Sequence, residues 1–450
     1  MKLDHKRTVL VGLAFFSICA FWQMYDNIIP LILTHTFQLD ETVCGAIMAA
    51  DNVLALVLLP FFGALSDRTS TRIGRRMPFI LGGTACAVLL MNLLPLFDNG
   101  YAATEEKGKL VLFVVALGLL LVAMGTYRSP AVALMPDVTP KPLRSKANAV
   151  INLMGSAGGI IVLALGMVFA TASVSNSMMS YTGYFGVIAA LMLAALVVFM
   201  LTVREPEWAR EMQAQSVAAG IEDAEEADHP NEGRKLSADE VKSLLLILLS
   251  IVLWFFGYNA VTSKYSVYAS NILHKDYNLT LIIAQAAAIA AYLPVGFIAG
   301  KIGRKKTILA GVVMLTVAFG VAGFLTADSP AALMNAMFAL AGIAWATINV
   351  NSFPMVVELA SGGDVGKYTG FYYTASMAAQ VATPMVSGLL MDKFGMHVLF
   401  PYAAVFTALA FVTMLFVKHG DSREMPKQTA AAGTEDAGAI DNTVEELTND

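Results

Sequence analysis

The stretch Gly63–Arg76, GALSDRTSTRIGRR, lies between two long apolar segments, and a shorter version returns at Gly296–Lys306 as GFIAGKIGRKK. Both versions place a glycine near the end of an apolar run and follow it with Gly-Arg-Arg or Gly-Arg-Lys. Two such turns in one chain predict a duplicated membrane protein with a tight basic turn in each copy.

The composition of the 450-residue chain favours a membrane protein, because 57% of its residues are hydrophobic and only 14% are charged. A soluble domain carries about 25% charged residues. Apolar runs near the roughly 20 residues that cross a bilayer recur along the chain, and they are too long for barrel strands. We therefore expect an all-α membrane protein with twelve spans, at residues 9–34, 45–66, 77–97, 110–136, 147–171, 182–203, 243–270, 279–300, 307–327, 331–357, 369–391 and 398–418.

The lysines and arginines predict how the chain crosses the membrane. If the N-terminus is cytoplasmic, 23 of the 29 basic residues fall on the cytoplasmic side and 4 fall outside. Basic residues concentrate in cytoplasmic loops, so we expect a multi-pass protein of the plasma membrane with both termini in the cytoplasm. The net charge of −5 comes mostly from an acidic linker and tail, and it gives no indication of a nucleic-acid partner.

The polar segments divide the chain into two sets of six spans. We predict an N-terminal six-helix bundle at 1–203, a cytoplasmic linker at 204–242, a C-terminal six-helix bundle at 243–420 and a disordered tail at 421–450. The linker includes a short surface helix near Glu205–Gln215. Asp137 and Lys146 are nine residues apart after the fourth span, as Glu358 and Lys367 are after the tenth. These matches indicate pseudo-symmetric halves with a binding site between them.

The cysteines and the other reactive residue types point to neither a metal site nor an enzyme. Cys19, Cys44 and Cys86 lack the paired spacing of a disulfide framework or a metal site. We expect no metal and no cofactor. The sequence shows no nucleophile–base constellation and no phosphate-binding loop. A membrane-embedded enzyme or a non-transporting sensor stays a minor alternative.

The turn at Gly63…Asp67-Arg68…Gly74-Arg75-Arg76 resembles the signature of the major facilitator superfamily of secondary transporters. The longer SDRTSTRIGRRMPFIL, together with TYRSPAVALMPDVTP, resembles its sucrose-type and glycoside/cation symporter branch. The resemblance implies two six-helix bundles that rock about a central site and carry a sugar with a proton or a sodium ion. Melibiose-type sodium symporters carry carboxylates just before a proline in the second span. Ala55 and Leu59 precede Pro60 here, which favours proton coupling.

Four ionisable residues lie inside the predicted spans: Asp26, Asp51, Arg128 and Lys264. A charge at the bilayer centre costs at least about 2.5–3.5 kcal/mol, so each should face a cavity or a partner. We expect Asp26 and Asp51 to couple transport to protons, and Asp26, Arg128 and Lys264 to bind substrate. The alternatives are an Asp26–Lys264 structural pair, a solvated charge near the external helix end for Asp51, a permanent salt bridge for Arg128, and a lysine that reaches the surface.

Amides and aromatic rings in the same spans suit a sugar, because amides hydrogen-bond hydroxyls and aromatic faces stack on sugar rings. We expect Asn259, Asn349 and Gln380 to contribute hydrogen bonds, although such side chains also bridge helices. The candidate aromatic residues, for which packing is the alternative, are Trp22, Tyr25, Tyr127, Trp254, Tyr258, Trp345, Tyr372 and Tyr373.

The basic turns should form a cytoplasmic gate. Gly63 should let two helices approach closely, and Asp67 should accept from the N-terminal amides of a neighbouring helix or from an arginine. Arg75 and Arg76 should also anchor the cytoplasmic side. The candidate gate residues are Gly63, Asp67, Arg68, Gly74, Arg75, Arg76, Asp137, Arg144, Gly303, Arg304 and Glu358.

The sequence therefore favours a monomeric secondary transporter in the lipid bilayer, most simply a proton-coupled symporter of a sugar or glycoside. A drug or metabolite efflux antiporter is one alternative, although MGSAGGIIVLALG lacks the proline usual in the fifth span of that family. Uptake of an organic acid or a nucleoside is another, because Arg128 would suit a carboxylate.

Overall fold

The computed structural model describes residues 2–39, 41–169, 171, 181–221, 236–273, 278–360 and 364–421. Twelve long helices account for most of this part of the chain and match the predicted spans in order. They are α1 (His5–Leu31), α2 (Glu41–Arg68), α3 (Met77–Thr104), α4 (Lys107–Asp137), α5 (Arg144–Val168), α6 (Thr182–Thr202), α9 (Ala238–Tyr268), α10 (Asn278–Ile302), α11 (Arg304–Ala322), α12 (Ala331–Val357), α13 (Val365–Phe394) and α14 (Leu399–Leu415).

Eleven helices of the described part are long and apolar enough to cross a membrane. The helix outside this set is α13, which has 30 residues but carries polar stretches such as KYTGFYYTAS. A span that lines a polar site can carry such residues, because they do not face lipid. The prediction of an all-α, multi-pass membrane protein is confirmed.

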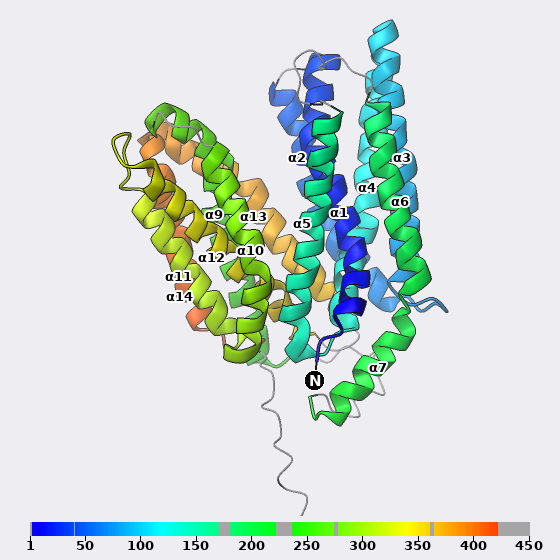
Figure 1. Ribbon diagram of the computed structural model, residues 1–450, viewed down its shortest axis with the longest axis vertical. Coiled ribbons are helices and arrows are strands. Elements are labelled where there is room, and N and C mark those ends of the chain that lie inside the picture. Colours follow the sequence, from blue (N-terminus) through cyan, green and yellow to red (C-terminus); the bar gives the residue numbers. More distant parts are fainter. Residues whose placement is uncertain are drawn as a thin grey trace, which may run out of the picture.

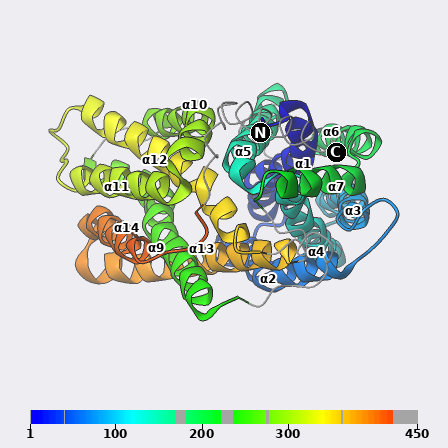
Figure 2. The ribbon, with the colours of Figure 1, turned by 90° about the horizontal axis from the view of Figure 1, so that it is seen from below.

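The long helices form two bundles, α1–α6 and α9–α14, which meet at the end that carries the N-terminus and diverge toward the other end (Figure 1). Across the interface α2 packs against α13, and α5 packs against α10. Each pair joins the second helix of one half to the fifth helix of the other. Figure 2, a view from below, shows the two bundles side by side. The prediction of two pseudo-symmetric six-helix bundles is confirmed.

The glycines of the two repeated turns share a backbone conformation. Gly74, before α3, has φ = 123°, and Gly303, before α11, has φ = 95°. These positive φ values are unfavourable for residues with a Cβ atom. The repeated Gly-Arg pair therefore marks the same chain reversal in both halves.

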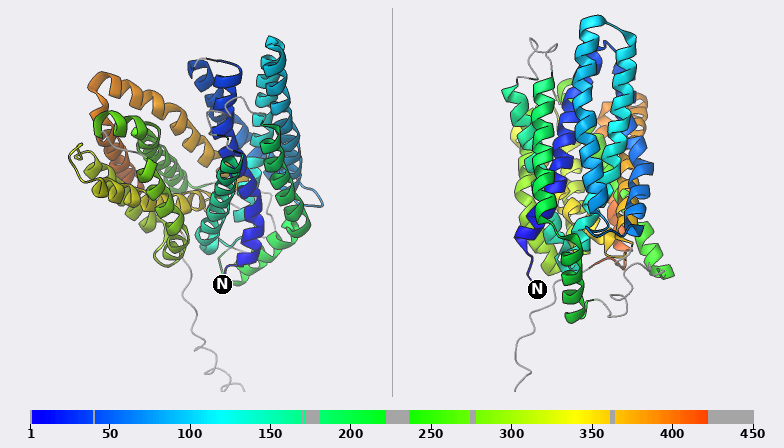
Figure 3. Two further views of the ribbon diagram at one scale, coloured as in Figure 1. Left: turned by 45° about the horizontal axis from the view of Figure 1, so that its top comes forward. Right: turned by 90° about the vertical axis from the view of Figure 1, so that its right-hand side faces the viewer.

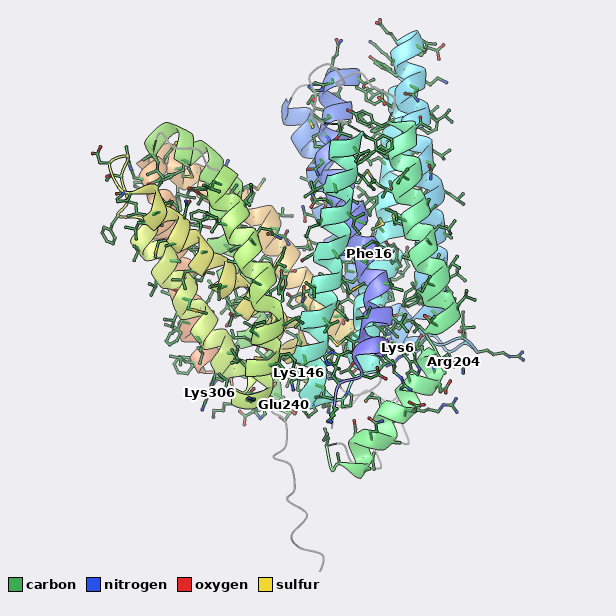
Figure 4. The ribbon with its side chains drawn as sticks, in the orientation of Figure 1. Lys6, Phe16, Lys146, Arg204, Glu240 and Lys306 are labelled. Carbon is green, nitrogen blue, oxygen red and sulfur yellow. The ribbon has the colours of Figure 1, made fainter. Side chains whose placement is uncertain are left out.

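A shorter helix, α7 (Glu205–Ala218), follows α6 and lies below the N-terminal bundle (Figure 3). It matches the surface helix expected near Glu205–Gln215. Residues 222–235 of the predicted linker and nearly all of the predicted tail, residues 422–450, lie outside the described residues, and the last residues of the predicted linker belong to α9. Among the residues labelled in Figure 4, Lys6, Lys146, Arg204 and Lys306 all lie toward the end that carries the N-terminus. We call this the N-terminal face of the molecule.

Candidate functional site

The first basic turn closes around Arg76, whose side chain is fully buried. Its Nε donates to Asp137 at 2.8 Å and its Nη2 donates to Asp67 at 2.5 Å. Its Nη1 also donates to the hydroxyl of Ser66. A buried guanidinium needs such partners, because an unpaired buried charge is strongly destabilising. The structure thus shows Arg76 as a buried side chain, and its predicted role as an anchor of the cytoplasmic side stays a prediction.

Asp67 joins the two bundles. Besides Arg76, its carboxylate accepts from the backbone amides of Gly366 at 2.9 Å and Lys367 at 2.8 Å. Both amides belong to the first turn of α13, where unpaired N–H groups and the helix dipole favour an anion. The contact has the geometry expected for Asp67, and its role as a gate stays a prediction.

Asp137 holds both arginines of the turn. Arg75 donates to it at 2.7 Å through Nη2 and at 3.3 Å through Nε, and Arg76 donates to the same carboxylate through its Nε. Arg68, by contrast, is exposed and lies beside Lys367 in a cavity between α2 and α13. Among the described residues, no hydrogen bond or ion pair of Arg68 supports its predicted place in the gate.

The second basic turn makes the corresponding contacts around Arg304. This buried guanidinium donates to Glu358 at 2.6 Å and to the hydroxyl of Ser145, on α5 of the other bundle, at 3.0 Å. Arg144 of the N-terminal bundle donates in turn to the carbonyl of Val357 at 3.2 Å. Arginines of both halves thus cross the interface at the N-terminal face.

Glycine permits the close packing of α2 on α13. A Cβ atom placed on Gly63 would lie 2.2 Å from the carbonyl oxygen of Gly366, and one on Gly370 would lie 2.4 Å from the Cα of Pro60. Neither distance is sterically allowed. The expected close approach at Gly63 is present.

Two acidic residues at these turns escaped the sequence reasoning. The buried Glu205, the first residue of α7, accepts from the backbone amides of Arg75, Arg76 and Met77 at 3.0–3.2 Å. Burial raises the pKa of its carboxyl, while the amide donors act in the opposite direction. Asp421 accepts from the amides of Arg304 at 2.6 Å and Lys305 at 3.3 Å.

Each of these acids caps the third helix of its half from just beyond the sixth. The signal that could have found them is an acid within a few residues of the last span in both copies, at EPEW and at GDSRE. The predicted boundaries place Glu205 in the cytoplasmic linker and Asp421 in the tail, with no role predicted for either side chain.

Arg128, near the middle of α4, lies between rings of both bundles. Its guanidinium carbon is 5.2 Å from the centre of the Trp22 ring on α1 and 5.0 Å from that of Tyr373 on α13. Its buried Nε has no hydrogen-bond partner. Stacking between two rings leaves the edge of a guanidinium as the side that can meet a planar acceptor.

Of the two predicted coupling acids, Asp51 lines a small pocket together with Arg128 and Trp22. Asp26 is exposed although it is well inside α1. Asp51 is half-buried, and its Oδ1 has no hydrogen-bond partner. Because α2 begins at Glu41, Asp51 lies ten residues, or about 15 Å, inside the helix. Asp51 is nearer the start of α2 than its end, and its predicted place near the external end of the span stays a prediction.

None of the four charges inside the spans has an ion-pair partner within 4.0 Å among the described residues. An Asp26–Lys264 pair and a permanent salt bridge of Arg128 are thus both absent from that part of the structure. Lys264 is half-buried on α9. Unpaired charges at this depth are costly and typical of functional positions.

The C-terminal bundle contributes a second polar and aromatic set. Tyr258 and Trp345 stack with ring centres 3.7 Å apart, and Tyr372 donates to the Oδ1 of Asn349 at 3.4 Å. Asn259 is half-buried and its Nδ2 has no partner.

Other expected site residues are less accessible. Trp254, Tyr25 and Tyr127 are at most 1% exposed, and the polar tip of each lacks a hydrogen-bond partner. The amide of Gln380 is engaged locally, with the carbonyl of Ser376 at 3.4 Å. These four residues have the surroundings of packed side chains, and their predicted contact with substrate stays untested.

Comparison with known proteins agrees with this architecture. A family model described as Major Facilitator Superfamily matches residues 11–290 and 271–440. The sucrose transport protein SUC3 of Arabidopsis thaliana is 30% identical over 173 residues, which cover 35% of this chain and 28% of that protein. The putative glycoside/cation symporter YagG of Escherichia coli is 26% identical over 182 residues, or 40% of this chain and 38% of the relative. The matches thus span well under half of these relatives.

Solved structures share the fold over nearly the whole chain. The proton:xylose symporter XylE superposes with a TM-score of 0.67 at 16% identity, covering 92% of this chain and 95% of that one. The transporter FucP, in its outward conformation, gives 0.67 at 14% identity, with 92% and 98% covered. The resemblance to the sucrose-type and glycoside/cation symporter branch is confirmed at the level of similarity, and the chain belongs to the Major Facilitator Superfamily.

Proposed function

We propose that this protein is a secondary active transporter that carries a sugar or a glycoside together with a proton by alternating access. The substrate class is supported by relatives named as sucrose transport proteins and as a glycoside/cation symporter. They match part of the chain at low identity, so the argument rests mainly on the residues between the bundles.

The observation that carries the proposal is the placement of Arg128 between Trp22 of one bundle and Tyr373 of the other. A substrate in this place would touch both halves, which a central site for rocking bundles requires. Aromatic faces suit sugar rings, and the guanidinium edge can donate two parallel bonds to oxygen atoms.

Asp26 is the best candidate for proton coupling. It is exposed within a span, and the bundles diverge toward the end away from the N-terminal face (Figure 1). When the bundles rock, the surroundings of a carboxylate at this place change from wet to dry. A dry surrounding favours the protonated form and a nearby cation favours the charged form, so the motion can load and release a proton.

Proton rather than sodium coupling is supported by the residues before Pro60. Ala55 and Leu59, which occupy the positions of the carboxylates in melibiose-type symporters, are both buried and apolar. They offer no oxygen ligands, which a hard cation such as sodium requires.

The proposal is tested by uptake into liposomes that contain the purified protein. Labelled sucrose, maltose and aryl glucosides should accumulate against their gradient when an inward proton gradient is imposed. Asp26→Asn should abolish this accumulation but keep exchange of labelled for unlabelled sugar. The matched control is Asn27→Ser, a change at the neighbouring exposed and uncharged residue, which should accumulate sugar normally. Accumulation driven by sodium and indifferent to pH would overturn the proton assignment.

An organic anion is a second candidate substrate, favoured by the absence of a carboxylate within 4.0 Å of Arg128 or Lys264 in the described residues. The same liposomes distinguish the two classes. Uptake of a glucuronide in place of the matching glucoside would establish an anionic cargo, and Arg128→Gln should then reverse the preference.

A further inference from the structure

Helix α12 contains a proline close to its C-terminal end. Pro354 lies three residues before Val357, the last residue of the helix. A proline has no N–H, so the carbonyl of Val350, four residues earlier, lacks the donor that an α-helix normally supplies. Val350 is fully buried, and a buried carbonyl without a donor costs free energy. This carbonyl therefore needs a donor from outside its own helix.

The other bundle supplies that donor. The side-chain amide of Asn148, on α5, donates to the carbonyl of Val350 at 2.9 Å and to that of Asn349 at 3.3 Å. Asn148 is only 6% exposed. The acceptor residue belongs to a buried apolar cluster that also includes Ala149 of α5 and Ala346 of α12. Little water can reach the bond while the bundles are in contact.

The pseudo-symmetric interface, where α13 packs on α4, lacks the proline. Pro354 lies four residues before Glu358, which the sequence repeat matches with Asp137. The residue four before Asp137 is Ala133, which keeps its N–H. Helix α4 can therefore supply its own backbone donor at the matching position.

The same interface also lacks the asparagine. Asn148 lies two residues after Lys146, and the residue two after the matching Lys367 is Thr369. The hydroxyl of Thr369 donates at 2.7 Å to a carbonyl of its own helix. The proline and the asparagine thus occur together where they meet, and both are missing from the other copy.

We propose that Asn148 supplies, across the bundle interface, the hydrogen bond that Pro354 removes from α12. The carbonyl of Val350 then has a protein donor only while the bundles are closed at the N-terminal face. Separation at this face would break the bond, so the pair shifts the population toward the closed arrangement. Asn148 is thus a positioning residue for alternating access, and in this respect the inference rests on the proposed function.

The test measures how often the interface opens, through the rate at which a water-soluble maleimide modifies a cysteine buried between the bundles. Ser145→Cys provides this reporter, because Ser145 on α5 is 2% exposed and accepts from Arg304 of the other bundle. It is introduced into a variant in which the three native cysteines have been replaced. When opening and closing are fast relative to modification, the rate is proportional to the fraction of open molecules.

Asn148→Leu, which is close in size but has no donor, should raise this rate about tenfold, as expected for the loss of a buried hydrogen bond. In a Pro354→Ala background, where residue 354 has its own N–H, the same change should raise the rate less than about threefold. The matched control is Asn152→Leu, because the Asn152 amide donates at 2.8 Å to a carbonyl of α5 itself. This control should change the rate less than about threefold.

An equal increase in both backgrounds, or no increase where Pro354 is present, would overturn the proposed pairing. If Pro354→Ala does not give folded protein, Asn148→Thr takes its place, because it copies the matching residue of the other half, whose hydroxyl donates within its own helix. It should also raise the rate about tenfold, and an unchanged rate would contradict the proposal. The labelling uses neither sugar nor an ion gradient, so a failure of the sugar or proton assignment leaves its result unaffected.

Discussion

Replacement of Asp67 by asparagine should open the interface between α2 and α13. The carboxylate accepts from two amides across the interface, at 2.9 Å from Gly366 and at 2.8 Å from Lys367. A hydrogen bond to a charged group contributes about 1.5–3 kcal/mol and a neutral one about 0.5–1.5 kcal/mol. Asparagine can keep one neutral bond of the two. Water can hydrogen-bond the freed amides once the interface opens, and this offsets part of the loss. We therefore expect the closed arrangement to lose about 2 kcal/mol of stability relative to the open one.

A loss of about 2 kcal/mol changes the ratio of closed to open molecules about thirtyfold. If about 99% of the molecules are closed, about 77% would remain so after the change. Spin labels on exposed residues of the two halves, at Arg72→Cys and Lys306→Cys, would report this as a longer distance at the N-terminal face. Both label sites are introduced into a variant in which the three native cysteines have been replaced.

The matched control is Asp364→Asn. Asp364 lies at the start of the same helix, but its side chain makes no capping hydrogen bond to α13. It should leave the distance distribution unchanged. An unchanged distribution for Asp67→Asn, or an equal shift for Asp364→Asn, would refute the reasoning that the α13 amides hold the interface closed.

Three further perturbations test other contacts. Gly63→Ala should slow transport at least tenfold and lengthen the same label distance, because the new Cβ would lie 2.2 Å from the α13 backbone. The control Gly82→Ala, whose Cβ would have no atom within 4 Å, should leave transport intact. In a denaturation assay, Glu205→Ala should lower the free energy of unfolding by about 2 kcal/mol, because three amides lose their acceptor. The control Glu207→Ala, at an exposed side chain, should change that free energy by less than about 0.5 kcal/mol. Arg128→Lys should raise the sugar concentration for half-maximal uptake about tenfold, because a lysine keeps the charge but loses the planar fork between two rings; an unchanged value would remove Arg128 from the substrate site.

The arrangement of the spans could be predicted from the sequence because apolar run length is nearly sufficient to define a transmembrane helix. The predicted run 331–357, for example, coincides with α12. The repeated Gly-Arg pair also predicted the symmetry. A positive φ, as at Gly74 and Gly303, favours glycine, so the shared conformation can be recognised from the sequence.

The contacts within the gate were less predictable. The nine-residue spacing placed Asp137 near the turn, but nothing in the spacing shows that one carboxylate serves both Arg75 and Arg76. Arg76 was predicted to anchor the cytoplasmic side, and nothing in the sequence predicted that its side chain would be buried. Its burial depends on Asp67 nearby in the sequence and on Asp137, 61 residues further along, which the packing of α2 on α4 brings together.

Glu205 and Asp421, which cap the third helix of each half, both lie after the sixth helix of that half. This order has a consequence for folding during synthesis. During synthesis, α3 enters the membrane long before Glu205 leaves the ribosome, and α11 does so before Asp421. The backbone amides at the start of these helices therefore lack their capping carboxylate until the segment after the sixth helix has been synthesised. Each basic turn reaches its final form last, so a half whose six helices are inserted becomes complete only when the next few residues have been translated.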